Sequence, residues 1–260
     1  MAHKLTWIPD LPDHRDLKYR SIHGPAGAIP NSVDLCSDPF MPPVFDQGDL
    51  GACVENALAG AMTFLEAKEG NGIVLLSRLF CYWNARGPGV YKKHDTGSTI
   101  RDAIKGIAAK GIPLESLWPY DPRTFAICPP EPAWGEAAHR APGLLYTRLE
   151  TIADMMACLA AGYPFTLGLT LYGPDNGTGA CDLDGLTAAA SVLPLPGYGE
   201  VAIGGHALLA VGYDRASSML KVRNSWGPAW GAAGYFSLPF AYATSRDLAD
   251  DFWSIRRIAK

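Results

Sequence analysis

The sequence has few charged residues and no strong excess of either sign, and both shortages narrow the possible functions. Only 18% of the 260 residues are charged, and 22 basic against 26 acidic residues give a net charge of −4. No run of like charges occurs, so the basic footprint of a nucleic-acid-binding protein is missing. We therefore expect no nucleic-acid partner.

Long hydrophobic runs are also missing. The longest nearly apolar stretch, residues 201–213, has 13 residues with a histidine in its middle. A membrane-spanning helix needs about 18 or more. Residues 1–4 run directly into mixed polar sequence, without the apolar core of a secretory signal peptide. We expect no membrane partner and no Sec-type signal, which leaves a cytoplasmic location or export by another route.

Paired cysteine motifs are absent as well. No C-x-x-C occurs, and no pair of histidines has zinc-binding spacing. An even number of cysteines permits three disulfides, but we expect mostly free thiols in a chain of this size without a signal peptide. We expect no metal and no cofactor, and one cysteine with a chemical role among six widely spaced ones: Cys36, Cys53, Cys81, Cys128, Cys158 and Cys181.

Glycine and proline, by contrast, are abundant. Together they account for 49 residues, about 19% of the chain against an average near 12%. They follow no G-x-y period, so they predict many turns and long ordered loops. The length suits one large domain or two small ones. Residues 1–28 mix prolines, histidines and charges with scattered apolar residues, which indicates an extended arm and not a domain.

The apolar pattern changes along the chain from a helical to an alternating period. Apolar residues at 54–65 follow the i, i+3, i+4 spacing, which predicts a helix closed by Gly70 and Gly72. Helices are also expected at 77–86, at 99–110 after a Ser98 cap, and at 151–161, with a proline-rich crossover at 119–143. Expected strands cover 165–172, 207–213, 219–222 and 235–238. Helices that precede strands indicate an α+β fold.

Three residues in this pattern could carry chemistry. Cys53 lies at the start of the first helix, where backbone N–H groups should lower the pKa of a thiol. His206 and Asn224 follow it by 153 and 171 residues, each beside a strand. Taken singly, such residues are most often structural. Together they form a candidate nucleophile system, because an Asn can hold one imidazole nitrogen and direct the other toward a thiol.

A series of motifs, in order over most of the chain, resembles the papain family of cysteine peptidases. They are IPNSVD (29–34), PVFDQG (43–48), GAC (51–53), GST (97–99), WPY (118–120), GHA (205–207) and NSWG (224–227), the last followed by WG (230–231) and GY (234–235). Several departures stand out. Leu50 replaces a cysteine that many relatives pair in a disulfide, Val54 an aromatic residue, and Ser98 the second glycine of a pair. With the long propeptide missing, the chain resembles a bacterial branch.

This resemblance implies a two-lobed α+β fold with the active-site cleft between the lobes. Residues 29–260 would form the peptidase domain. Its mainly helical lobe would cover about 29–120, and its mainly strand lobe, an antiparallel and barrel-like half, about 121–260.

The resemblance also implies a role for each site residue. Cys53 would be the nucleophile, His206 the general base and then acid, and Asn224 the residue that orients the imidazole. Gln47 would donate its side-chain amide to the oxyanion together with the Cys53 N–H. An acyl-enzyme thioester would form on Cys53 and be hydrolysed by water.

The substrate would be a peptide or protein. Gly97 and Ser98 would bind its backbone on one wall of the cleft and Gly205 on the other, while Trp226 would shield the His–Asn bond from water. Because the residues around Gly205 are small, we expect a roomy pocket that tolerates apolar side chains.

Two other functions remain open at this point. The same residues could serve a thiol acyltransferase or an amidase that acts on a non-protein substrate. A non-catalytic binding protein could keep the fold, although it would not need the complete set of Gln47, Cys53, His206 and Asn224. The arm of residues 1–28 also has two interpretations: a short pro-segment that lies over the cleft and inhibits, or a structural extension.

Overall fold

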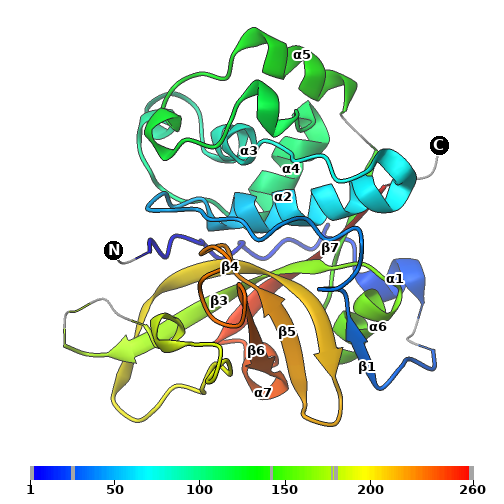
Figure 1. Cartoon of the computed structure of the whole chain (residues 1–260), viewed down its shortest axis with the longest axis vertical. Helices are drawn as coiled ribbons and strands as arrows, with labels where there is room; N and C mark the ends of the chain where they lie inside the picture. Colours follow the sequence, from blue (N-terminus) through cyan, green and yellow to red (C-terminus); the bar gives the residue numbers. More distant parts are fainter. Residues whose placement is uncertain (1–2, 25–26, 141–142, 177, 179–180, 258–260) are drawn as a thin grey trace.

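Two halves of the molecule, one helical and one built on a sheet, face each other across the N-terminal segment (Figure 1). The computed structural model describes residues 3–24, 27–140, 143–176, 178 and 181–257. The helical half contains α2 (Cys53–Glu66), which continues into the π turn η1 (Ala67–Asn71), then α3 (Arg78–Ala85), α4 (Ile100–Lys110), α5 (Glu131–His139) and the 3-10 turns η2 (Gly89–Lys93), η3 (Glu115–Leu117) and η4 (Pro122–Thr124).

The other half is a single antiparallel sheet with short helices on it. Its strands are ordered β2-β7-β3-β4-β5-β6, and β1 also pairs with β4. In the described residues the sheet stays open, so the predicted antiparallel half is confirmed without closure into a barrel. The strands are β1 (Ser32–Asp34), β2 (Leu144–Arg148), β3 (Phe165–Pro174), β4 (Glu200–Asp214), β5 (Met219–Arg223), β6 (Tyr235–Pro239) and β7 (Ala249–Arg257); the helices are α1 (Tyr19–His23), α6 (Ile152–Ala160), η5 (Asp182–Gly185) and α7 (Phe240–Ala243).

The helix α2 forms the boundary between the halves, and all fourteen of its residues are buried. Ala57 and Phe64 pack into the core of the sheet half, whereas Val54, Leu58 and Met62 pack against the core of the helical half. A helix buried on both sides needs apolar or satisfied polar residues all round. This explains why its acidic and amide side chains, which the sequence pattern places away from the apolar stripe, are also buried.

Short polar side chains determine where the other helices begin. Ser77 caps α3, and Thr151 forms a capping box with Asp154 at α6. Thr99, not Ser98, accepts the N–H of Asp102 and caps α4, so the prediction of Ser98 as the cap is wrong. Ser98 is thereby left free for the contacts described below.

The structure adds elements that the sequence pattern does not reveal. The strands β2 and β7 pair with each other over residues that lie more than a hundred positions apart. The helix α5 lies inside the proline-rich segment 119–143 and packs in the helical half, with Ala133 and Ala137 in a core with Trp118. Early residues also contribute to the sheet through β1. The division of the domain near residue 120 stays a prediction.

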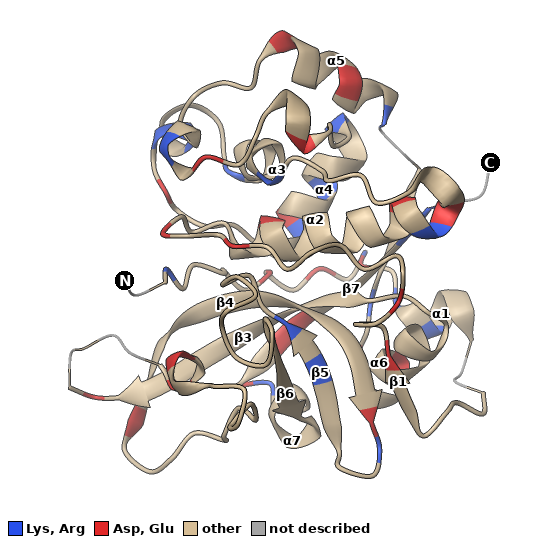
Figure 2. Cartoon of the chain, in the orientation of Figure 1, with Lys and Arg blue, Asp and Glu red and all other residues tan. Residues whose placement is uncertain are grey.

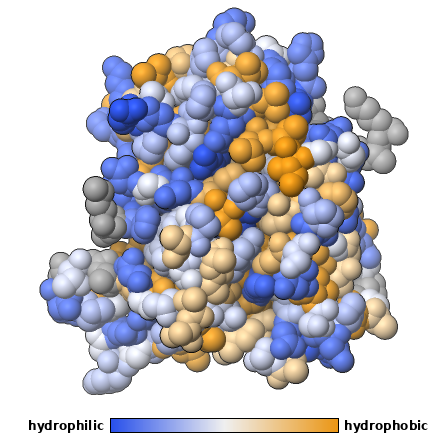
Figure 3. Space-filling view, viewed as in Figure 1, coloured by the Kyte–Doolittle hydropathy of each residue, from blue (hydrophilic) through white to orange (hydrophobic). Residues whose placement is uncertain are grey.

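Basic and acidic residues are distributed over the elements of both halves (Figure 2). Figure 3 shows polar side chains over much of the helical half and apolar ones gathered where the two halves meet. No helix in the described ranges is long and apolar enough to cross a membrane.

Candidate active site

The candidate nucleophile, Cys53, is the first residue of α2 and is completely buried. A residue from another part of the chain fixes the turn before it: the Gly51 N–H donates to the carboxylate of Asp95 at 3.0 Å. Ala52 offers the helix no side-chain cap. The unpaired N–H groups of the first turn are therefore available to the sulfur, and that of Val54 favours its thiolate form.

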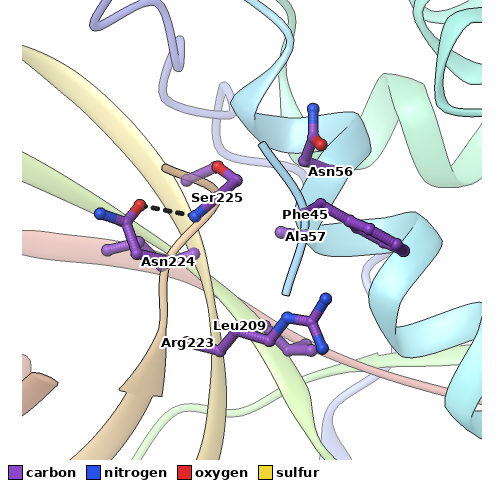
Figure 4. A pocket seen from close by; sticks show the side chains of 9 residues that line it. Phe45, Asn56, Ala57, Leu209, Arg223, Asn224 and Ser225 are labelled. Carbon is purple, nitrogen blue, oxygen red and sulfur yellow. Dashed lines mark hydrogen bonds between the residues drawn. The ribbon is translucent and has the colours of Figure 1, made fainter. Parts of the chain in front are cut away.

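The imidazole of His206 is oriented by the sheet. His206 lies in β4, Asn224 directly follows the neighbouring β5, and the His206 Nε2–H donates to Asn224 Oδ1 at 2.8 Å. The same oxygen accepts the N–H of Ser225 at 2.8 Å (Figure 4). Nδ1 is left as the proton acceptor of the neutral ring, and it has no hydrogen-bond partner among the described residues. The arrangement thus presents one free basic nitrogen.

Close packing seals the back of this site. A cavity of about 10 Å³, room for at most one water molecule, lies between α2 and the strands β4 and β5. Residues from both halves line it, among them Phe45, Asn56, Arg223 and Asn224 (Figure 4). The two halves are therefore closely packed at this place, with no room for a substrate between them.

Trp226 covers the edge of the histidine ring. The centroid of its ring lies 5.1 Å from that of His206, with 35° between the ring planes, and its side chain is almost completely buried. Two other rings contact Trp226. Trp230 meets it edge-on, with 5.3 Å between the ring centroids, and His3 of the N-terminal arm stacks on it at 4.3 Å with only 9° between the ring planes. An arm residue therefore occupies the surface beside the candidate catalytic histidine.

The side chain of Gln47 is buried and fixed at both ends. Its Oε1 accepts from Ser225 Oγ at 2.6 Å, and its Nε2 donates to the carbonyl of Leu50 at 3.1 Å. The Gln47 N–H also donates to the carbonyl of Ser225, which ties the nucleophile turn to the strand half. An amide nitrogen has two N–H donors, so one remains for a further acceptor.

The predicted cleft walls are occupied by the arm. The Trp7 N–H donates to the carbonyl of Gly205 at 2.9 Å, and the Ile8 N–H donates to that of Ser98 at 3.1 Å. Thr6 Oγ1 donates to the carbonyl of Gly51 in the nucleophile turn. The arm runs through the cleft as an extended chain paired with both walls, and Figure 1 shows this blue segment between α2 and the sheet.

The glycines of the walls make this close approach possible. A Cβ on Gly97 would lie 2.0 Å from the carbonyl oxygen of Thr6, and one on Gly205 would lie 2.4 Å from that of Trp7. A Cβ on Gly168 of β3 would lie 2.0 Å from the indole of Trp7. The absence of side chains at these positions therefore creates both the backbone contacts and the pocket that holds the Trp7 side chain.

The arm changes the acid–base state expected for the site. Burial raises the pKa of the Cys53 thiol to about 11, although the backbone groups of Ala207 and Thr6 lower it in part. Burial also lowers the pKa of His206 to about 4, against the bond to Asn224, and the charge of His3 lowers it further. The sequence-based expectation of a lowered thiol pKa is wrong for this conformation, because the covered site is dry.

A second set of arm contacts lies beyond the cleft, at Asp10. Its Oδ1 accepts the N–H of Arg101 in α4, and its Oδ2 accepts from Trp253 Nε1 and lies 3.3 Å from the Arg148 guanidinium. Its own N–H donates to the carboxylate of Asp251 at 2.7 Å. The sequence reasoning missed this cluster. A single Asp in a polar arm carries no signal of its burial.

All six cysteines are unpaired, as expected. Within the described ranges, no group of three or more His, Cys, Asp and Glu side chains is arranged to hold a metal ion. The side chains described above supply a thiol, an imidazole and amide donors.

Comparisons with known proteins identify the family of the chain. A family model described as papain family cysteine protease matches residues 196–250. An uncharacterised peptidase C1-like protein of Acanthamoeba polyphaga mimivirus is 35% identical over 223 residues, which are 82% of this chain and 69% of that protein.

Solved structures extend the similarity. Xylellain, a cysteine protease from Xylella fastidiosa, matches with a TM-score of 0.85 at 34% identity, over 98% of this chain and 96% of that one. Digestive procathepsin L 3 from Tenebrio molitor larval midgut shares the fold at a TM-score of 0.66 and 20% identity, over 93% and 73%. The chain belongs to the papain family and is a cysteine peptidase.

Proposed function

We propose that the protein hydrolyses peptide bonds with Cys53 as nucleophile and His206 as general base and acid. The observation that carries this proposal is the 2.8 Å bond from His206 Nε2 to Asn224 Oδ1, which leaves Nδ1 free beside the helix that begins at Cys53. Asn224 orients the ring, and Trp226 keeps water from its bond.

The reaction proceeds through a thioester. Nδ1 of His206 takes the thiol proton, and the sulfur of Cys53 forms a bond to the substrate carbonyl carbon. The resulting oxyanion accepts the free N–H of Gln47 and the N–H of Cys53. When the C–N bond breaks, His206 returns its proton to the leaving amine. Water then gives a proton to His206, attacks the thioester carbon and restores the thiol as the acid leaves.

Substitution of the site residues tests this function in the full-length chain that also carries Trp7→Ala, which empties the pocket filled by the arm. We expect Cys53→Ala to abolish hydrolysis of fluorogenic peptides, and Gln47→Ala to lower kcat/KM by about a hundredfold or more through the loss of about 2.7–4 kcal/mol of transition-state stabilisation. Cys36→Ala is the matched control, because Cys36 lies outside the site. Peptide hydrolysis that survives in Cys53→Ala would contradict the proposal.

The substrate assay also decides between the alternatives. An acyltransferase or amidase with the same residues would react with a thiol reagent at Cys53. It would not hydrolyse the peptides. A binding protein would show neither reaction. The continuous pairing of an extended chain with both walls, at Gly205 and Ser98, supports a peptide as the substrate.

We also propose that residues 3–8 inhibit the enzyme by occupying the cleft. Cys53 and His206 are completely buried with the arm in place, and the arm uses the wall atoms that an extended substrate would need. It also holds the thiol and the imidazole in their neutral forms. Its release would restore solvent and allow the charged pair to form. The Trp7 pocket, bounded by Gly168 and Gly205, would then accept a bulky apolar side chain of the substrate.

Gly168→Ala tests this inhibition without removing any residue of the arm. The new Cβ collides with the indole of Trp7, whereas Gly168 lies in a strand with an ordinary φ that alanine tolerates. We expect the rate of Cys53 alkylation by iodoacetamide to rise about tenfold or more, the effect of about 1.4 kcal/mol of lost docking. Gly185→Ala, where a Cβ meets only open space, is the control. Equal alkylation rates in wild type and Gly168→Ala would rule out a blocking arm.

A further inference from the structure

Glu55 is a buried carboxyl that the proposed reaction does not use. It lies in the first turn of α2, two residues after Cys53, and is completely buried. Its Oε1 accepts a hydrogen bond from Ser98 Oγ at 2.5 Å, and its Oε2 has no hydrogen-bond partner in the parts of the chain that the structure describes. Burial of a carboxyl that holds a single hydroxyl is costly, which calls for a compensating role.

Ser98 connects this carboxyl to the cleft. Its carbonyl accepts the N–H of Ile8, while its hydroxyl bonds to Glu55 inside the helical half. Gly97 before it has a φ of 70° and lies against the arm backbone, and Thr99 after it caps α4. The hydroxyl of Ser98 is thus the side-chain contact that links the wall to α2, the helix that carries the nucleophile.

We propose that Glu55 is a positioning residue of the active site, which holds Ser98 so that the wall carbonyl faces an extended chain in the cleft. A wall fixed in advance saves the free energy of ordering it when a peptide binds. Glu55 also joins the wall to the helix of Cys53, so the binding surface and the nucleophile keep one relative position. This inference rests on the proposed function, since it takes the Ser98 wall as the substrate-binding surface.

The charge of Glu55 gives the proposal a pH signature. The ionisable groups that act on it or feel its charge are Cys53 on α2, Cys81 and Tyr82 on α3, Arg86, Asp95 and Tyr120. Arg86 is no direct partner, because its guanidinium donates to four backbone carbonyls. Burial raises the pKa of Glu55 to about 7, against the bond from Ser98. An ionised acceptor bonds the hydroxyl more strongly, so the grip on Ser98 should tighten above neutrality.

Peptide hydrolysis by full-length variants tests this role. The parent chain carries Trp7→Ala, which empties the pocket that the arm fills. We expect Glu55→Met and Ser98→Ala each to raise KM about three- to tenfold with kcat within about twofold, the effect of one lost hydrogen bond on binding alone. The double variant should show no further increase, because both substitutions break the same contact.

Glu55→Gln separates positioning from a general structural role. Gln keeps an acceptor for Ser98 Oγ but cannot ionise. The KM of Glu55→Gln should therefore equal that of the parent at about pH 6 and should not change between about pH 6 and 8. The parent's own KM should fall about threefold over that range. Thr63→Val, which removes another buried hydroxyl contact of α2 far from the cleft, is the matched control and should leave KM unchanged. Additive effects, or a change in kcat alone, would overturn the proposal.

A second measurement keeps the outcome separate from the proposed function. In the otherwise wild-type chain, hydrogen exchange of the Ile8 amide reports its bond to the Ser98 carbonyl without any catalysis. Ser98→Ala and Glu55→Met should speed this exchange about three- to tenfold, and Glu55→Gln much less. If the parent is inactive but the exchange responds, the function fails and the positioning role stands; if exchange and KM are both unchanged, the positioning role fails.

Discussion

The two parts of the N-terminal arm are bound in different ways. Residues 3–8 lie in the cleft through backbone pairing and ring contacts, and each of these wall atoms is one that another extended chain could use. Asp10, two residues further on, is bound by Arg101, Arg148, Trp253 and Asp251, all buried or largely buried. The first part is replaceable and the second is not. The arm is therefore both an occupant of the cleft and a structural part of the fold, the two roles that the sequence left as alternatives.

Deletion of the arm would remove both kinds of contact at once. A chain that begins at residue 29 would lose the cleft segment and the Asp10 cluster together. It would leave the buried Trp253 and Arg101 groups without partners, so inactivity could reflect unfolding alone. Point variants that affect one part at a time are the informative experiments.

The largest effect is expected for Asp10→Ala. Arg148 keeps Asp16, Asp250 and Asp251 as partners, but the buried N–H groups of Arg101 and Trp253 lose their acceptor, at a cost of about 1–3 kcal/mol each. We expect the free energy of unfolding, measured with urea, to fall by about that amount. Asp13→Ala is the control, because Asp13 pairs with exposed Arg15. A loss below about 1 kcal/mol would mean that residues 10–16 are as replaceable as residues 3–8.

Acid should release the cleft segment but not the anchor. Burial in the docked state lowers the pKa of His206 to about 4 from its ordinary 6.5. In Cys53→Ala, where no thiolate can pair with the ring, the docked state therefore binds fewer protons, and docking should weaken by up to about tenfold per pH unit as the pH falls from about 6.5 to 4. The NMR signal of the Trp7 indole, assigned with Trp7→Phe, measures the undocked population. His206→Gln should abolish this dependence, and docking that strengthens in acid would refute the explanation.

The smallest effect is expected for His3→Ala at the far end of the cleft segment. Its ring stacks on Trp226 with an almost parallel geometry, a contact worth about 0.5–1.5 kcal/mol. We expect two- to tenfold faster alkylation of Cys53 and an unchanged free energy of unfolding. Lys4→Ala serves as a comparison, since its ion pair with Asp95 is half exposed and should contribute less. A greater effect of Lys4→Ala would mean that the ion pair of Lys4 with Asp95, and not the stacking of His3 on Trp226, is the main contact of this end.

The elements that could be predicted from the sequence are those with a local signal. The helix over Cys53–Glu66 follows its apolar period, and the caps Ser77 and Thr151 lie where short polar residues precede helical patterns. The strand β7 and the helix α5 were missed. The strand β7 is stabilised by pairing with the distant β2, and α5 is a short helix inside a segment whose prolines indicate a crossover, although Pro132 lies in its first turn, where proline is tolerated.

For the site, residue types and their order identified the family, the candidate triad and Gln47, because the chemistry requires those side chains at matching places in the fold. Their protonation state was not predictable. A helix N-terminus favours a thiolate, but the complete burial of Cys53 in the folded chain outweighs it. The sequence likewise shows Glu55 only as an acidic residue of a helix, because its contact with Ser98 exists only in the folded chain. Local pattern and motif order thus determine which elements and reactive groups exist. Desolvation and long-range pairing, which depend on the whole chain, decide which of those groups are covered, charged or held in place.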